Sequence, residues 1–109
     1  MTVYYARLED TGRIKIGHAE DAYRRAHTLV VQFKTSVTLL ATEPGGFDRE
    51  EEVLEEFAFC LYPGAGEIFL PSPALLARIE SLKIEPYHVR HRTRAQRWAE
   101  YYAEKSARC

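Results

Sequence analysis

The first thirty residues alternate as a β-hairpin followed by a helix would. Residues 3–8 are β-prone and residues 13–16 alternate strictly between polar and apolar side chains, with a turn signal at residues 9–12 between them. Side chains two apart on a strand share a face. If the apolar sets of both strands share the core, this period predicts that Tyr5 and Lys15 lie together on the polar face of the hairpin.

Helical periodicity and turn signals organise the rest of the chain. Ser72 followed by Pro73 is a helix start signal, and Thr93 with Gln96 fits a capping box. In the first helix, Arg25 borders the buried stripe, so its head can reach along the sheet face. The predicted elements are a helix from about residue 20 to 30, a strand at 36–42, a helix with its apolar face on Val53, Leu54, Phe57, Cys60 and Leu61, a short strand at 67–70, a helix after Ser72 and a last helix after Thr93.

The length and composition are those of one globular domain. The chain has 109 residues, of which 46% are hydrophobic and 28% are charged, and this balance argues against disorder. No apolar run approaches the ~18 residues that a membrane-spanning helix needs, and the N-terminus lacks the pattern of a signal peptide. The two cysteines, Cys60 and Cys109, fit neither a disulfide framework nor a metal-ligand spacing. We therefore expect a cytoplasmic protein with no membrane partner.

The net charge of −1 conceals a basic C-terminal end. Residues 88–109 hold six Lys and Arg against two Glu, a net charge of +4, so the remaining residues carry −5. Much of this acid lies at residues 48–56, which hold six acidic residues and one arginine. The basic end also carries Trp98, Tyr101 and Tyr102. Such a mixture either grips phosphates and stacks on bases or packs against the domain or a partner subunit.

An ordered set of motifs runs along most of the chain. It begins with Val3-Tyr4-Tyr5, continues with Lys15-Ile16-Gly17 after nine intervening residues, and places Arg25 ten positions after Lys15. Asp21 before Arg25, an acid-rich second helix and the segment 57–69 follow in the same order. This set resembles the GIY-YIG nuclease superfamily, and most closely its phage-type, Orf172-like DNA-binding branch. The resemblance covers roughly residues 3–80.

The resemblance implies a fold class and a division of the chain. The expected fold is α+β, with a small antiparallel three-stranded sheet flanked by helices and an added C-terminal helix. Residues 1–83 would form the GIY-YIG-like domain. Residues 84–109 lie outside the resemblance, and their pattern predicts a basic, aromatic helical extension that packs on the domain or on a partner. A homodimer through this helix is one arrangement of the extension.

The resemblance also implies the residues of a nuclease site. Tyr5 would be the tyrosine of the first motif, which accepts a proton from the attacking water or orients it. Arg25 would hold and neutralise the scissile phosphate. Glu50 would ligate Mg²⁺ or Mn²⁺, because the helical face and the alignment through the following motif agree on it. Glu51 and Glu52 are the acids that a shift of register would select instead.

Further residues complete or alter this site. Glu67 occupies the closing motif, and His18 lies where many relatives carry a basic residue, so it can contact phosphate or assist a proton transfer. Lys15 stands where the wider superfamily has its second tyrosine, and it can help a phenol ionise or contact phosphate as a point charge. Leu54 stands where the phage branch often has a histidine.

Each assignment has a plainer interpretation that the sequence leaves open. Tyr5 is otherwise an ordinary aromatic on the sheet surface. Arg25 is otherwise the partner of Asp21 at four-residue spacing. Glu50 is otherwise a solvated acid in the first turn of a helix, where the dipole favours it.

The sequence therefore supports two functions. The first is a DNA-binding endonuclease that hydrolyses phosphodiester bonds with one divalent metal ion. The alternative, suggested by Lys15 and Leu54, is a catalytically inactive module of the same fold that binds DNA or another protein. For the endonuclease, we expect the site residues to converge on one face of the sheet. These are Tyr5, Lys15, Arg25, Glu50 and Glu67.

Overall fold

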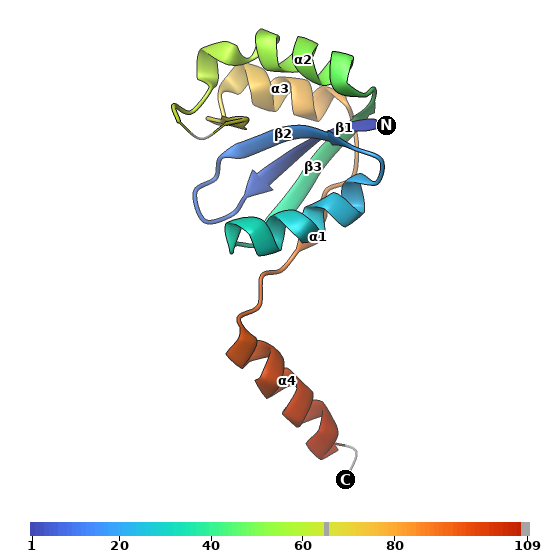
Figure 1. Ribbon diagram of the computed structural model, residues 1–109, viewed down its shortest axis with the longest axis vertical. Helices are drawn as coiled ribbons and strands as arrows, with labels where there is room; N and C mark the ends of the chain where they lie inside the picture. The colour runs from blue at the N-terminus through green and yellow to red at the C-terminus, as the bar shows by residue number, and fades with distance from the viewer. Residues whose placement is uncertain (65, 108–109) are drawn as a thin grey trace.

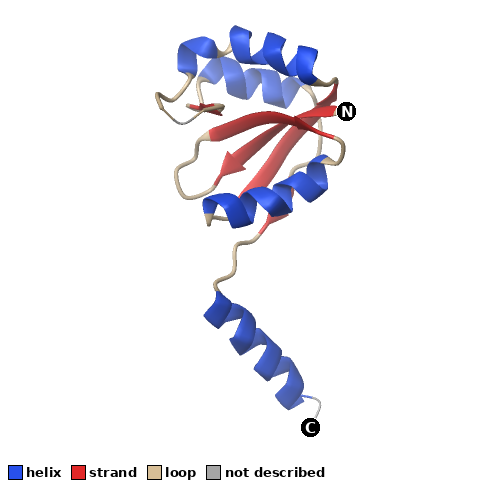
Figure 2. Ribbon diagram, in the orientation of Figure 1, coloured by secondary structure: helices blue, strands red, loops and turns tan. Residues whose placement is uncertain are grey.

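The computed structural model describes residues 1–64 and 66–107, which form a layered domain followed by a separate helix (Figure 1). Helix α1 covers one face of the sheet, and α2 and α3 cover the other (Figures 1 and 2). In chain order the elements are β1 (Thr2–Leu8), β2 (Ile14–Ala19), α1 (Ala22–Phe33), β3 (Val37–Pro44), α2 (Phe47–Glu56), a short 3₁₀ turn (Ala58–Cys60), β4 (Ile68–Phe69), α3 (Pro73–Ser81), β5 (Tyr87–Val89) and α4 (Arg94–Ala107).

The sheet is antiparallel and has five strands in the order β4-β2-β1-β3-β5. The expectation of a small three-stranded sheet was therefore wrong. Strand β4 pairs with β2 through only two residues, and β5 pairs with β3 through only three. The sequence predicted β4 as a short strand at 67–70 but not its pairing, and it did not predict β5, because strands this short depend on the neighbouring strand more than on their own pattern. Strand β5 also lies beyond residue 83, so the sheet includes part of the expected C-terminal extension.

The central strand β1 is buried on both faces, because helices cover both sides of the sheet. Tyr4, 1% exposed, packs in the layer under α1, and Tyr5, 0% exposed, packs in the layer under α2 and α3. The strand pairing places Tyr5 opposite Ile16 and Ala6 opposite Lys15. Lys15 thus shares a face with Tyr4 and not with Tyr5, so the expectation of a polar hairpin face that carries Tyr5 and Lys15 was wrong.

Side-chain caps set the beginnings of three helices. Asp21 caps α1 by accepting a hydrogen bond from the backbone N–H of Arg24. Ser72 caps α3 in the same way, with Pro73 at the first helical position, as the sequence predicted. The capping box before α4 is confirmed, since the side chains of Thr93 and Gln96 each accept a hydrogen bond from the backbone N–H of the other.

Helix α4 stands away from the layered domain and lengthens the molecule, whose extents are 56 × 27 × 21 Å (Figure 1). Among the described residues, α4 makes no extensive contact with the layered domain, whereas β5, which belongs to the expected extension, joins the sheet (Figure 1). None of the helices in the described part of the chain is long and apolar enough to cross a membrane.

Candidate functional site

A small polar hollow lies at the edge of the sheet, where the pairing of β2 with β4 ends. Its volume of about 140 Å³ is below the roughly 300–1,000 Å³ of sites that enclose small organic ligands, so it suits a single group such as a phosphate. Its lining comes from β1, β2, α1, α2 and the segment before β4. The lining residues are Tyr4, Lys15, Gly17, His18, Arg25, Glu50 and Glu67.

Tyr4 reaches the hollow by crossing over Gly17, its partner on β2. A Cβ atom on Gly17 would lie 2.5 Å from the hydroxyl oxygen of Tyr4 and 2.7 Å from the ring carbon that bears it. A side chain at this position would therefore displace the ring. Glycine is needed in β2 because a neighbouring aromatic approaches the backbone closely.

The phenol of Tyr4 is held in its neutral form. Burial raises the pKa of Tyr4 above its ordinary value of 10.0, while the positive charge of Arg25 and a hydrogen bond from it act in the opposite direction. The charges of Glu50 and Glu67 raise the pKa further. Near pH 7 the O–H of Tyr4 is therefore a hydrogen-bond donor at the hollow.

Glu50 brings a buried carboxylate to the hollow from the first turn of α2. It is 5% exposed, whereas Glu51 and Glu52 are exposed, so of these three acids only Glu50 lines the hollow. Its Oε2 atom contacts Nδ1 of His18. An Nδ1–H that donates to Glu50 leaves Nε2 of His18 as an acceptor, which is the arrangement of a histidine oriented by a carboxylate.

Lys15 and Glu67 close the side of the hollow next to β4. Lys15 Nζ lies 2.6 Å from Glu67 Oε2 and also donates to the carbonyl oxygen of Ile16. The Glu67 side chain is 48% exposed. The Lys15 side chain is only 13% exposed, so solvent screens this pair mainly on the side of Glu67, whose carboxylate can turn into water when an anion approaches.

Arg25 projects from the first turn of α1 toward Tyr4. The side chain of Asp21 caps α1 instead of pairing with Arg25, and no ion pair links the two side chains in the part of the chain that the structure describes. The guanidinium is therefore available to an anion in the hollow, and its planar fork suits a phosphate group.

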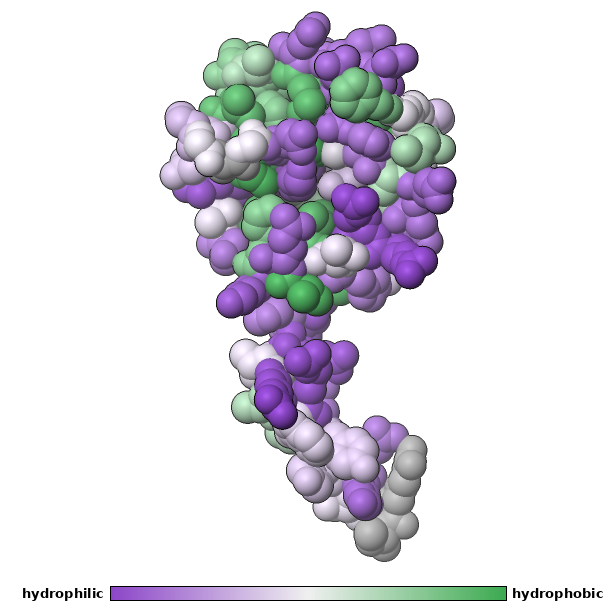
Figure 3. Space-filling model, viewed as in Figure 1, coloured by the Kyte–Doolittle hydropathy of each residue, from purple (hydrophilic) through white to green (hydrophobic). Residues whose placement is uncertain are grey.

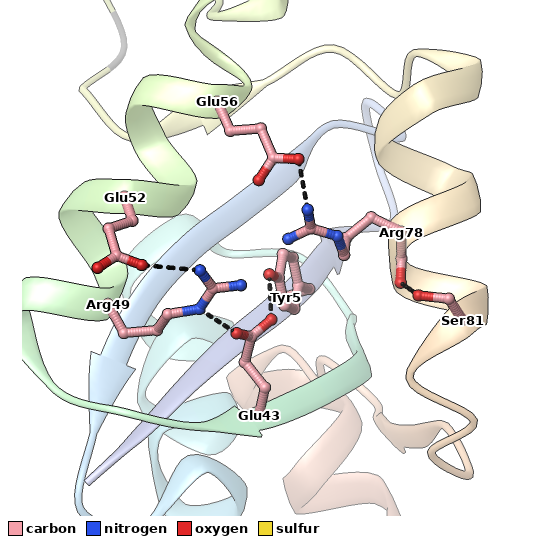
Figure 4. Close-up of polar contacts among 7 residues, drawn as sticks. All are labelled: Tyr5, Glu43, Arg49, Glu52, Glu56, Arg78 and Ser81. Carbon is pink, nitrogen blue, oxygen red and sulfur yellow. Dashed lines mark hydrogen bonds and ion pairs between the residues drawn. The ribbon is translucent and has the colours of Figure 1, made fainter.

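Tyr5 does not belong to the hollow, because it points to the opposite face of the sheet. Its O–H donates to Glu43 Oε2 at 2.7 Å, and Arg49 Nε donates to the other oxygen of Glu43 (Figure 4). Arg78 of α3 lies beside this group and pairs with Glu56. Burial raises the pKa of Tyr5 strongly, and the hydrogen bond and charge of Glu43 raise it further. This cluster ties β1, β3, α2 and α3 together.

The structure thus gathers five of the six residues predicted for the site, and Tyr4 takes the place expected for Tyr5. A signal for this was present in the sequence. A hairpin that joins Leu8 to Arg13 places Tyr4 opposite Gly17, and a glycine inside a strand marks a close approach by a neighbouring group.

Comparisons of the chain with known protein families, with curated proteins and with solved structures find no match. The fold and the hollow therefore characterise the protein. It is an α+β domain with a five-stranded antiparallel sheet. At one edge of this sheet lies a small polar hollow lined by the neutral phenol of Tyr4, the guanidinium of Arg25 and the buried carboxylate of Glu50.

Proposed function

We propose that this protein is a DNA endonuclease that hydrolyses phosphodiester bonds in the hollow at the edge of β2. The observation that carries the proposal is the meeting of Tyr4, Arg25 and Glu50 in one hollow of phosphate size. The resemblance of the motifs to the GIY-YIG superfamily supports the same reaction, with Tyr4 as the tyrosine of the site. A cytoplasmic location fits Cys60, a free and buried thiol.

The cofactor of the proposed reaction is Mg²⁺ or Mn²⁺, with Glu50 as its protein ligand. Mg²⁺ is usually held by one or two carboxylates together with waters and substrate phosphates, so a single buried carboxylate fits it. Within residues 1–64 and 66–107, no group of three or more His, Cys, Asp and Glu side chains gathers as a metal cage. We therefore expect weak metal binding without DNA. When bound, the ion would neutralise phosphate charge and lower the pKa of a water.

The side chains of the hollow bind the phosphate and position the attacking water. Arg25 binds the non-bridging oxygens of the phosphate, and Lys15 adds a second positive charge. The neutral phenol of Tyr4 donates a hydrogen bond that orients the attacking water. Nε2 of His18 accepts the proton of this water while Glu50 orients the ring. The water oxygen bonds to phosphorus as the bond from phosphorus to the leaving sugar oxygen breaks, and the leaving oxygen takes up a proton from solvent water.

Nicking of supercoiled plasmid DNA in Mg²⁺, Mn²⁺ or EDTA tests this proposal. We expect nicking that requires the metal and that Arg25→Ala and Glu50→Gln abolish. Glu51→Ala is the matched control, because it removes an exposed acid next to Glu50 and should leave nicking unchanged. Full nicking by Glu50→Gln would refute the assignment of the site.

A second pair of variants tests which tyrosine serves the reaction. Tyr4→Phe keeps the ring over Gly17 but removes the hydroxyl from the hollow, so we expect a loss of nicking of about 10²-fold or more. Tyr5→Phe removes a hydroxyl of similar burial from the opposite face, and we expect nicking to persist. The reverse result would assign the reaction to Tyr5.

A DNA-binding module without cleavage is the second candidate function. It is favoured by the contacts that both carboxylates of the hollow already make, Glu50 with His18 and Glu67 with Lys15. This candidate predicts a mobility shift that salt weakens and that does not depend on metal, with no nicking. Failure to bind DNA even at low salt would favour a protein-interaction module instead.

A further inference from the structure

Helix α4 carries a preformed aromatic cluster that is open to solvent. Trp98, Tyr101 and Tyr102 are 48%, 53% and 57% exposed. Trp98 stacks on Tyr102, with ring centroids 5.6 Å apart, and meets Tyr101 edge to face at 5.9 Å. A helix of 14 residues is marginally stable alone in water, so an exposed aromatic face on it indicates a surface that binds something.

Cations without an acidic partner lie beside this cluster. Arg94 and Arg97 line a hollow together with Trp98 and Tyr101. Among the described residues, neither arginine forms an ion pair. Arg90 and Arg92, which lie in the linker between β5 and α4 (residues 90–93), both pair with Glu100. In Figure 3 the linker and the start of α4 are strongly hydrophilic, and the surface of α4 beyond them is paler.

These cations continue toward the candidate site along the outer face of α1. One hollow, lined by Arg24, Arg25 and Thr28 together with Ala19 and the acidic Glu20 and Asp21, shares Arg25 with the candidate site. A second hollow joins His27 of α1 to the linker and to Arg97, which also lines the hollow of α4. His27 and Thr28 lie three and four positions after Arg24, so each is a neighbour of Arg24 on the helix surface. We call this surface the track; it runs from the candidate site along α1 and the linker to Trp98.

The chemistry of the track matches one class of polymer. Unpaired arginines attract phosphates, and exposed aromatic rings stack on bases that are not paired. Bases of a duplex are already stacked and do not offer their faces to such rings. The acidic helix α2 of a second copy of the chain would also complement the positive charge of the track. Binding of a second copy would not explain why the arginine-lined hollows continue to the candidate site.

We propose that a single-stranded segment of DNA lies along this track, with its phosphates on Arg24, Arg94 and Arg97 and a base against Trp98. The inference rests on the proposed function, which identifies the polymer as DNA. It adds to that function a class of substrate. The substrate is DNA with an unpaired segment next to the strand that enters the hollow. Helix α4 holds this segment and takes no part in the hydrolysis.

Fluorescence anisotropy in EDTA tests the track without any cleavage, using fluorescein-labelled single strands and duplexes of about 20 nucleotides. We expect Trp98→Ala to weaken single-strand binding by about 5- to 140-fold and duplex binding much less, and Trp98→Phe to retain most of the affinity. We expect Arg97→Ala to reduce the slope of log affinity against log salt by about 0.7. Arg7→Ala is the matched control for charge, because Arg7 pairs with Glu9 outside the track.

The outcomes separate this inference from the proposed function. Equal effects of Arg97→Ala and Arg7→Ala, or unchanged single-strand affinity in Trp98→Ala, would overturn the track. Sedimentation velocity that shows a dimer, with Trp98→Ala monomeric and unchanged in DNA affinity, would overturn it in favour of a second copy. An absence of nicking would contradict only the proposed hydrolysis, because binding is measured in EDTA. Circular dichroism of Trp98→Ala checks that the domain remains folded.

Discussion

Gly17→Ala should destabilise the protein because the new methyl group would occupy the volume of the Tyr4 ring. The added Cβ would lie 2.5–2.9 Å from three atoms of that ring, closer than real carbon contacts allow. Tyr4 is 1% exposed and packed in the layer under α1, so its ring cannot move without disturbing the core. Overpacking of this kind typically costs about 1–3 kcal/mol in free energy of unfolding.

Urea unfolding followed by circular dichroism measures this cost, and a double-mutant cycle assigns it to the ring. Since 1 kcal/mol corresponds to about 4–8 °C for a domain near this size, the melting temperature should fall by about 4–24 °C. In a Tyr4→Leu background the clash is absent, and Gly17→Ala should then be nearly neutral. The expected coupling energy between the two positions is therefore about 1–3 kcal/mol.

Gly46→Ala is the matched control for the loss of a glycine. Its added Cβ would meet the side chain of Met1 at 3.5 Å, an ordinary contact, so we expect a change within about 1 kcal/mol. The reasoning fails if Gly17→Ala costs no more than Gly46→Ala. It fails equally if the cost of Gly17→Ala persists unchanged beside Tyr4→Leu.

Three further predictions concern the core and the titration of buried groups. In urea unfolding, Leu29→Ala on the buried face of α1 should cost about 2–5 kcal/mol and Val31→Ala, 75% exposed, less than about 0.5 kcal/mol; equal costs would contradict this orientation of α1. Because folding raises the pKa of Tyr5, the unfolded chain loses this proton at a lower pH than the folded protein does. The contribution of Tyr5 to the free energy of unfolding is therefore fully present below pH 10.0 and decreases as the pH rises further. Tyr5→Phe should therefore leave the tyrosinate absorbance of the folded protein unchanged at about pH 10 to 11, and a reduced amplitude would show that Tyr5 ionises there. Burial acts to raise the pKa of Glu9, but the hydrogen bonds from Arg7 and Thr38 outweigh it, so the pKa is lowered. The stability that Glu9 contributes is therefore present above pH 4.5 and is lost as the pH falls further. In thermal unfolding, Glu9→Gln should lose less stability than the parent between about pH 5 and 3, and an identical loss would refute this.

Local signals predicted the starts of α3 and α4, because helix caps are decided within a few residues. The end of the second helix was predicted wrongly, since α2 ends at Glu56, before the Cys60 and Leu61 that were expected on its apolar face. Ser72 and Thr93 begin their helices with the cap contacts that the sequence predicted, since each acts within three positions. Strands β4 and β5 depend on partners far away in sequence. The pairing of Val37 with Val89 joins residues more than fifty positions apart, and no local pattern reports it.

The residues that the helices contribute to the candidate site could be predicted from the sequence, whereas the tyrosine that β1 contributes could not. Arg25 and Glu50 were selected by the resemblance, and the helical period agreed with it on the face that each residue takes. On β1 both faces are apolar, so the same reasoning could not choose between Tyr4 and Tyr5. A shift of one residue on a strand exchanges its faces, and this is the error that the structure corrects.

The position of the hollow explains why its residues come from both faces of the sheet. Over the residues that the structure describes, β4 pairs with β2 only at Ile14 and Lys15, so the outer edge of β2 lies open from Gly17 onward. Arg25 reaches this edge from the α1 face, and Glu50 reaches it from the α2 face. A search for one polar face of the hairpin therefore had the wrong geometry, because the candidate site lies at an edge of the sheet. Strand β4, which the sequence predicted as a short strand without indicating its partner, is short enough to leave this edge of β2 open.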